Sequence, residues 1–311
     1  MGEPETAAAV AVRAEGFGLK GPRGWAFRGV DIDAGPGTLI AIEGPSGSGR
    51  TCLLLALTGR MKPAEGRATV GSHGLPQHMS AVRGISALAH VPGVTDLEPA
   101  LTVGEHLLER ALLQRRFTGP LRDTLRGLLR PRAERLAEAR RRVDRALTTA
   151  GLDVAALPKG ARTAVRDLER LEALRLSVAL ALIGEPRLLA VDDTDLKLSD
   201  AERTEVWALL RSLTESGTTV VAVCSEAPEG AVVVSTRPGP GEAAADAPLD
   251  PDDRDEAAAP DAPQDPTDRD GAAAPDAPQD PADPDATGTA DANGDDDEKE
   301  TADALPETGR A

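Results

Sequence analysis

A glycine-rich turn, GPSGSGRT (44–51), stands between a strand-like run, TLIAIE, and a helix-like run, TCLLLALTG, that ends at Gly59. Glycines let the backbone point its N–H groups inward, so several amides and a helix N-terminus can converge on phosphate oxygens. The turn alone would also suit an unrelated α/β domain. Its place after a strand and before a helix favours a loop that binds the phosphates of a nucleotide.

The predicted contacts with the nucleotide come from this loop and the first residues of its helix: Gly44, Pro45, Ser46, Gly47, Ser48, Gly49, Arg50, Thr51 and Cys52. Thr51 is placed to bind Mg²⁺ through its hydroxyl group. Consensus phosphate loops have lysine where this chain has Arg50. Arginine keeps the positive charge but is a planar fork, so we expect nucleotide binding to be weakened rather than abolished.

Apolar and β-branched runs bounded by glycine and proline predict further strands on both sides of a long helical segment. The helical pattern begins near Leu101 and includes LTVGEHLLERALLQRRF and RAERLAEARRRVDRALTTAGL. The predicted fold is a mixed α/β core with an inserted α-helical subdomain at about 101–180. The predicted strands, in chain order, are Val10–Arg13, Ala26–Asp33, Thr38–Glu43, Arg67–Val70, Ser86–Val91, Leu188–Asp192, Thr218–Val223 and Ala231–Ser235.

From about Gly239 the chain consists largely of alanine, aspartate and proline, and DRDEAAAPDAPQDPT is repeated as DRDGAAAPDAPQDPA. Residues 241–311 hold 23 acidic and four basic side chains, a net charge of −19. Because the whole chain carries −17, residues 1–240 carry +2. We predict a folded domain at 1–238 and a disordered Asp/Ala/Pro-rich tail at 239–311.

Further segments over residues 10–236 follow the loop in an order that resembles the ATP-binding subunits of bacterial ATP-binding cassette (ABC) transporters. LEPALTVGEHL (97–107) resembles the start of the family's helical subdomain, and LIGEPRLLAVDD (182–193) resembles the strand that ends in its second nucleotide motif. GTTVVAVCSEAP (217–228) resembles the strand before its switch histidine. The resemblance implies a phosphate-loop nucleoside triphosphatase core that binds ATP and Mg²⁺.

The resemblance also assigns roles to the two carboxylates after Leu188–Val191. Asp192 would hold Mg²⁺ through water. Asp193 takes the place of the family's catalytic glutamate, which polarises the attacking water, and its side chain is one methylene shorter. A displacement of about 1 Å can cost on the order of 100-fold in rate, so slow hydrolysis is expected. A solvated strand end or a helix cap is the alternative interpretation of such a pair.

Three further motifs of the family are degenerate. No glutamine lies between Gln77 and Gln114, so the glutamine that senses Mg²⁺ and the membrane partner is absent. The signature motif falls on LERLE (168–172), which lacks its serine and glycines and whose glutamates would repel a phosphate. Ser225 stands at the switch histidine.

Aromatic side chains, which stack on adenine in this family, make up only 2% of the chain and include no tyrosine. No aromatic residue stands at the family's usual position. Trp25 or Phe27 could serve instead.

A basic segment runs from Arg110 to Arg145, with 12 arginines and four acidic residues and a net charge of +8. The favoured interpretation is a solvated helical face, because arginine is a good helix former. A surface for a membrane partner's cytoplasmic loops or anionic headgroups, and a surface screened by the acidic tail, are the alternatives. Nucleic-acid binding is not expected, because the tail would compete and no aromatic platform accompanies the arginines.

Only two cysteines occur, Cys52 and Cys224, which argues against a secreted disulfide framework. The N-terminus lacks the basic residues of a signal peptide, and no run approaches the roughly 18 apolar residues of a membrane span. We therefore expect a cytoplasmic protein, peripheral at the inner face of the cell membrane, that acts with a separate membrane-spanning transporter subunit.

The leading functional hypothesis is an ATP-binding transporter subunit with weak or partner-dependent hydrolysis, in a dimer with a second ATP-binding cassette subunit. The degenerate motifs also fit a non-hydrolysing scaffold or nucleotide-sensing regulator of a membrane complex. A stand-alone phosphoryl-transfer enzyme is a third hypothesis, disfavoured because the segments after the loop follow cassette order.

Overall fold

The computed structural model describes residues 9–22, 24–117 and 132–237. The predicted acidic tail and part of the predicted basic segment, residues 118–131, lie outside the described residues.

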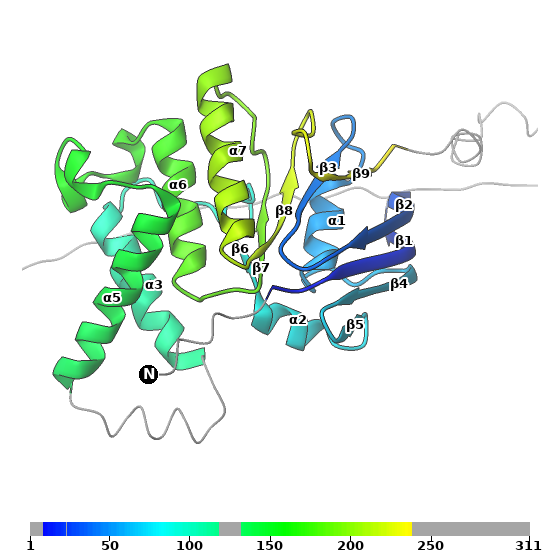
Figure 1. Ribbon diagram of the computed structural model, residues 1–311, viewed down its shortest axis with the longest axis horizontal. Coiled ribbons are helices and arrows are strands. Elements are labelled where there is room, and N and C mark those ends of the chain that lie inside the picture. The colour runs from blue at the N-terminus through cyan, green and yellow to red at the C-terminus, as the bar shows by residue number, and fades with distance from the viewer. Residues whose placement is uncertain (1–8, 23, 118–131, 238–311) are drawn as a thin grey trace, which may run out of the picture. The chain divides into compact units, whose positions relative to one another are not determined.

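A five-stranded parallel sheet forms the centre of the domain, in the order β6-β7-β8-β3-β9 (Figure 1). Ile40 of β3, for example, lies opposite Val221 of β8 on one side and Val232 of β9 on the other. Because all five strands run in the same direction, their carboxyl ends form one edge, called here the carboxyl edge. The strands are β6 (Ser86–Leu88), β7 (Leu188–Val191), β8 (Thr219–Val223), β3 (Leu39–Glu43) and β9 (Val232–Ser235).

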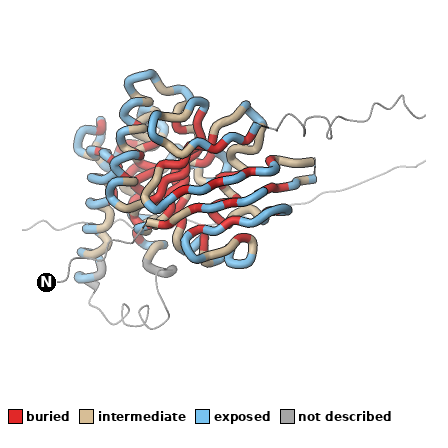
Figure 2. Tube along the Cα trace, turned by 45° about the vertical axis from the view of Figure 1, so that its right-hand side comes forward, coloured by how far each residue is buried: buried red, intermediate tan, exposed pale blue. Residues whose placement is uncertain are grey.

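The parallel sheet separates two hydrophobic cores, because successive side chains of a strand point to opposite faces. Ile40 and Ile42 pack in the core that contains α1, whereas Leu39 packs in the core that contains α6 and α7. Figure 2 shows the buried residues concentrated in these central strands. The helices are α1 (Arg50–Leu57), α6 (Arg170–Leu182) and α7 (Asp200–Glu215).

A second, antiparallel sheet in the order β2-β1-β4-β5 shares the core of α1. Its strands are β1 (Val12–Gly21), β2 (Gly24–Ala34), β4 (Glu65–Val70) and β5 (His73–Leu75), and the short helix α2 (Met79–Ile85) follows them. This sheet holds the start of β2 against the glycine-rich loop.

Three helices form a third apolar cluster beside the parallel sheet (Figure 1). They are α3 (Val103–Phe117), α5 (Arg132–Ala150) and α6, and their contacts include Leu107, Ala146 and Leu176. Three short 3-10 turns, Val154–Ala156, Gly160–Arg162 and Val165–Asp167, connect α5 to α6. Within the described part of the chain, every helix is too short or too polar to cross a membrane.

Each predicted strand overlaps an observed one, and the mixed α/β fold is confirmed. β1 extends beyond its predicted end at Arg13, because the strand continues through a bulge: Gly16 has φ 54° at a register shift against β2. The short elements β5 and α2 were not predicted. The boundaries of the folded domain, the helical subdomain and the tail remain predictions.

Candidate nucleotide-binding site

Every strand of the parallel sheet brings a polar group to the carboxyl edge, where ligands bind in open α/β sheets. The glycine-rich loop follows β3, and the paired carboxylates follow β7. The ends of the other three strands supply His90, Cys224 and Thr236. Groups far apart in the sequence therefore surround one loop.

The loop glycines adopt backbone conformations that favour glycine. Gly44, Gly47 and Gly49 have φ of 159°, 81° and 81°, values that other residues rarely adopt. Gly49 is the N-cap of α1, and the Leu53 amide donates to its carbonyl oxygen at 2.8 Å. The loop therefore leads directly into the N-terminus of α1, and a helix N-terminus is a favourable place for an anion.

Two of these glycines also allow close packing. A Cβ at Gly49 would lie 2.0 Å from the carbonyl oxygen of Ala26 in β2. A Cβ at Gly44 would lie 2.5 Å from Thr236 Oγ1 and 2.6 Å from Ser48 Oγ. The loop is therefore fitted between β2 and β9, and neither position can accept a side chain without displacing its neighbours.

The two predicted metal ligands lie side by side. Thr51 Oγ1 donates a hydrogen bond of 2.6 Å to Asp192 Oδ2, although the residues are 141 positions apart in the chain. The other carboxylate oxygen of Asp192 accepts from the Asp193 amide at 2.9 Å. Asp192 is only 2% exposed, so its orientation is fixed by these two bonds and by the surrounding core.

This pair of residues fits a magnesium ion. Burial raises the pKa of the Asp192 carboxyl, against the lowering effect of the hydrogen bonds from Thr51 and Asp193, and the charge of Asp193 raises it further. A buried carboxylate that is costly to ionise is stabilised by a divalent cation. Mg²⁺ prefers one or two carboxylate or hydroxyl oxygens together with phosphate oxygens and water.

Asp193 adopts a left-handed backbone conformation, with φ of 48°. This conformation is uncommon for residues other than glycine, although aspartate tolerates it better than most. Half-buried Asp193 lies next to Asp192 at the carboxyl edge, so the structure brings together both carboxylates and the loop. Unusual backbone geometry of this kind is concentrated at functional sites.

The Arg50 side chain makes a hydrogen bond within the protein. Its Nη1 donates to the carbonyl oxygen of Cys224, at the end of β8, at 2.9 Å. The guanidinium group is thereby held at the carboxyl edge, next to the loop that it belongs to. A phosphate group that needs this nitrogen has to compete with the carbonyl group.

The sequence analysis did not identify His90, which follows β6 in the segment where the expected glutamine is absent. Its carbonyl oxygen accepts from the Asp192 amide at 2.6 Å, and its Nε2 lies 3.2 Å from Arg170 Nη2. Burial, and then the charge of Arg170, lower the pKa of the imidazole. A neutral imidazole accepts from arginine through Nε2, so His90 connects the end of β7 with the start of α6.

The LERLE segment forms the start of α6. Glu169 is the N-cap residue of α6, and its amide donates to Glu172 Oε2 at 2.9 Å in a capping box. The two carboxylates therefore occupy the helix N-terminus, where a phosphate would otherwise be favoured.

Ser225, at the position of the family's switch histidine, is bound through its backbone. Its amide donates to Asp195 Oδ2 at 2.7 Å.

Of the two aromatic candidates, Phe27 is excluded as a stacking platform. It is 4% exposed and packs against Phe17 with ring centroids 5.9 Å apart. Trp25 is partly exposed and is next in sequence to Ala26, which touches the loop. The guanidinium carbon of Arg28 lies 4.6 Å from the Trp25 ring centroid, so a base would share this ring with a cation.

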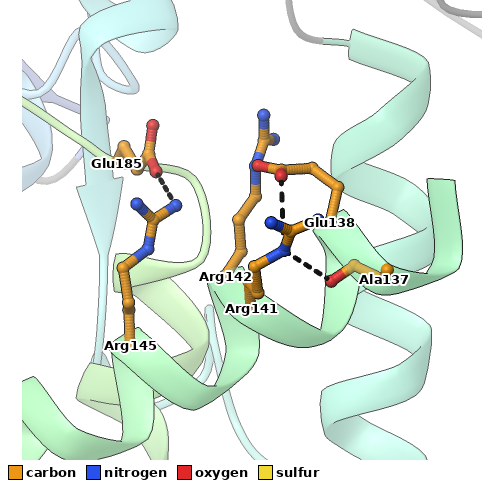
Figure 3. Close-up of polar contacts among 6 residues, drawn as sticks. All are labelled: Ala137, Glu138, Arg141, Arg142, Arg145 and Glu185. Atoms are coloured by element: carbon orange, nitrogen blue, oxygen red, sulfur yellow. Dashed lines mark hydrogen bonds and ion pairs between the residues drawn. The ribbon is translucent and has the colours of Figure 1, made fainter. Parts of the chain in front are cut away.

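Three arginines of α5, Arg141, Arg142 and Arg145, contact nearby acceptors (Figure 3). Arg142 Nε donates to Glu138 at 3.3 Å, and Arg145 Nη2 donates to Glu185 at 3.0 Å. Arg141 Nε contacts the Ala137 carbonyl oxygen at 3.4 Å. These contacts favour the solvated helical face over a surface dedicated to a charged ligand.

A cavity of about 430 Å³ lies away from the loop, between the end of β6, α3 and α6. Leu88 and Ala89 line one side, and Arg110, Leu113 and Leu180 line others. Leu113 is 43% exposed, and Leu112, its neighbour in α3, is 51% exposed. This groove is a candidate surface for another protein, distinct from the loop.

The family described as ABC transporter matches this chain over residues 27–195. Among curated proteins, the Nod factor export ATP-binding protein I of Cupriavidus metallidurans is 30% identical over 192 residues, which cover 62% of this chain and 55% of that protein. The daunorubicin resistance ATP-binding protein DrrA3 of Streptomyces coeruleorubidus is 32% identical over 196 residues, covering 63% and 54%. The chain thus spans about half the length of these relatives.

Solved structures show the same fold. The dimeric structure of MJ0796, a bacterial ABC transporter cassette, superposes with a TM-score of 0.54 at 20% identity, covering 72% of this chain and 94% of that one. A post-hydrolysis state of MJ0796 bound to ADP and Pi gives 0.53 at 22% identity, covering 69% and 88%.

Proposed function

The chain belongs to the ABC transporter family, and from this premise we propose that it is a subunit that binds Mg-ATP through residues 44–52. The contact of Thr51 with Asp192 carries the proposal, because it joins the end of the loop to the paired carboxylates with a 2.6 Å hydrogen bond. The Thr51 hydroxyl and the Asp192 carboxylate, hydrogen-bonded to each other beside a glycine-rich loop at a helix N-terminus, suit a magnesium-bound polyphosphate better than other ligands.

The family resemblance suggests a role for each residue of the proposed site, and the geometry supports these roles. The loop amides and Arg50 bind the phosphates, Thr51 and Asp192 hold the metal, and Asp193 orients the attacking water as a weak base. Bound Mg²⁺ would neutralise charge on the β- and γ-phosphates. Asp193 has a shorter reach than glutamate, so turnover is slow.

Hydrolysis also depends on a second subunit in this proposal. The N-terminus of α6 is closed by the Glu169–Glu172 capping box, which offers carboxylates in place of donors to a phosphate on a facing cassette. In a homodimer, both copies would present carboxylates in place of hydrogen-bond donors. We therefore favour a dimer with a competent second cassette subunit over a homodimer.

A separate membrane-spanning subunit completes the proposed complex, with this chain in the cytoplasm at the inner face of the membrane. The groove beside α3 supports this, because Leu113 lines it, is exposed and would be buried by a partner. The groove also adjoins Leu88 and Ala89, which lead to His90 at the nucleotide site. A partner bound in the groove and a nucleotide bound at the site would thus both act on residues 88–90.

The capping box equally favours a second candidate, a nucleotide-sensing scaffold that never hydrolyses ATP. The two candidates share the binding site and differ in turnover alone.

Calorimetric titration of the full chain with Mg-ATP, followed by a hydrolysis assay, tests the proposal. Wild-type protein should bind, with slow turnover or none. Gly49→Ala should abolish binding, because its Cβ would meet the Ala26 carbonyl oxygen at 2.0 Å. Gly84→Ala is the matched control, because a Cβ there meets nothing within 4 Å. Equal binding by wild type and Gly49→Ala would refute the site. Fast ATP hydrolysis by the wild type would refute the proposal that its turnover is slow.

A further inference from the structure

We propose that Thr236, at the carboxyl end of β9, is a positioning residue that holds the phosphate loop in its binding conformation before the nucleotide arrives. The inference rests on the proposed nucleotide site and adds a residue to which no function has been attached. Thr236 lies 188 positions from its partner in the loop, beyond all the motifs of the sequence analysis.

The contact is a short hydrogen bond between two hydroxyl groups. Ser48 Oγ and Thr236 Oγ1 are 2.6 Å apart, and Thr236 is only 6% exposed. Thr236 Oγ1 also lies 3.4 Å from the carbonyl oxygen of Glu43, to which it can donate. Either hydroxyl can donate in the pair, and the Thr236 hydroxyl lies between the Ser48 hydroxyl and the Glu43 carbonyl group, with a contact to each.

The backbone of β9 fixes Thr236 independently of its side chain. The Thr236 amide donates to the Glu43 carbonyl oxygen at 3.0 Å, which continues the parallel pairing of β9 with β3. Thr236 is thus attached to the strand that leads into the loop, and its hydroxyl reaches the loop four residues after its start at Gly44. The same hydroxyl occupies the space that a side chain at Gly44 would need.

The position of Ser48 gives this bond its effect. Ser48 lies between Gly47 and Gly49, both in left-handed conformations, and the amides on either side are those expected to face the phosphates. Glycines permit this conformation but do not enforce it, because they also populate many others. A hydrogen bond at the intervening residue restricts these alternatives, and ordering a binding loop in advance improves affinity.

The test compares Mg-ATP affinity in Thr236→Val, Ser48→Ala and the double variant of the full chain. Each single change should weaken binding by about three- to tenfold, the effect of one hydrogen bond. The double variant should be no weaker than the singles, because all three lack the same bond. Thr236→Ser retains the hydroxyl and should bind within about twofold of wild type.

Thr219→Val is the matched control for stability. Thr219 is a fully buried threonine at the opposite end of the same sheet, where its hydroxyl donates to the Val10 carbonyl oxygen at 2.6 Å. Its loss should lower the melting temperature without changing Mg-ATP affinity. Unchanged affinity in Thr236→Val, or an equal loss in Thr219→Val, would overturn the positioning role.

Hydrogen exchange without nucleotide separates this inference from the proposed function. Thr236→Val should speed exchange of the loop amides at 47–51 while leaving β3 protected. If the wild type fails to bind Mg-ATP, the proposed function is wrong, and faster exchange in the variant still upholds the anchoring role. Identical exchange in wild type and variant would refute that role in either case.

Discussion

Arg50 stands where consensus phosphate loops have lysine, and we expect it to weaken the proposed site without removing it. The glycines around it have positive φ, and Gly49 packs closely against β2, an arrangement that suits a phosphate loop. The guanidinium group instead donates to the Cys224 carbonyl oxygen at 2.9 Å. This bond stabilises the free protein and has to be given up, or shared, when phosphate binds.

Replacement of Arg50 by lysine should therefore tighten Mg-ATP binding. A lysine ammonium is compact and matches consensus loops, and a hydrogen bond lost from the free state is worth about 1 kcal/mol, or roughly fivefold in affinity. Arg50→Met removes the charge and should weaken binding. Titration of both variants by calorimetry measures the effect, and weaker binding by Arg50→Lys than by wild type would refute the competition with Cys224.

Site residues that belong to local sequence motifs could be predicted from the sequence. Site residues that reach the site only through the order of the strands in the sheet could not. Thr51 and Asp192 could be placed together because the loop and the strand end are each recognisable by pattern. His90 and Thr236 follow strands whose neighbours in the sheet cannot be read from the sequence. For Thr236 the only signal was a polar residue directly after the predicted strand Ala231–Ser235, which also occurs at ordinary strand ends. His90 fell inside the predicted strand Ser86–Val91.

The N-termini of two helices, α3 and α7, carry a capping pattern in the sequence. Thr102 and Glu105 at the start of α3, and Ser199 and Glu202 at the start of α7, exchange hydrogen bonds between side chain and backbone. Both match the pattern of a serine or threonine followed three residues later by glutamate, which is readable in the sequence. By contrast, the bulge at Gly16 was not predicted, because glycine occurs in both turns and bulges.

The capping box of α7 makes a predictable contribution to stability against acid. The Ser199 hydroxyl and backbone donate to Glu202 and lower the pKa of its carboxyl. A lowered pKa means that the contribution is present above the unfolded-state pKa of about 4.3 and is lost as the pH falls through the folded value.

Glu202→Gln should thus lower the melting temperature by roughly 1–3 °C at pH 7, and the difference should shrink below about pH 4. Glu215→Gln, at the end of the same helix, changes the charge equally and is the control. A difference that is constant with pH would contradict this account of the box.

For the whole molecule, the uneven charge suggests two regions with separate physical roles. The net charge of the chain, −17, arises from residues 241–311, whose own net charge is −19. We propose that residues 1–238 are the folding unit, with the helical subdomain at about 101–180, because apolar residues able to form a core are concentrated there.

A chain that ends at Pro238 should therefore melt within about 2 °C of the full chain, because residues 239–311 are largely alanine, aspartate and proline and offer few side chains able to form a core. Its Mg-ATP affinity should also be unchanged, because every residue proposed to contact the nucleotide or the metal is retained. Calorimetry and thermal melting of both chains provide the measurement. A fall of many degrees on truncation would show that the tail belongs to the folded unit.

The magnesium dependence of ATP binding tests the central claim most directly. ATP affinity should be measured with Mg²⁺ and with excess chelator, in wild type and in Asp192→Asn. The site built from Thr51 and Asp192 predicts that Mg²⁺ tightens binding by the wild type and that Asp192→Asn loses most of this gain. Equal ATP affinity with and without Mg²⁺ in the wild type would contradict the assignment of these two residues as the metal site.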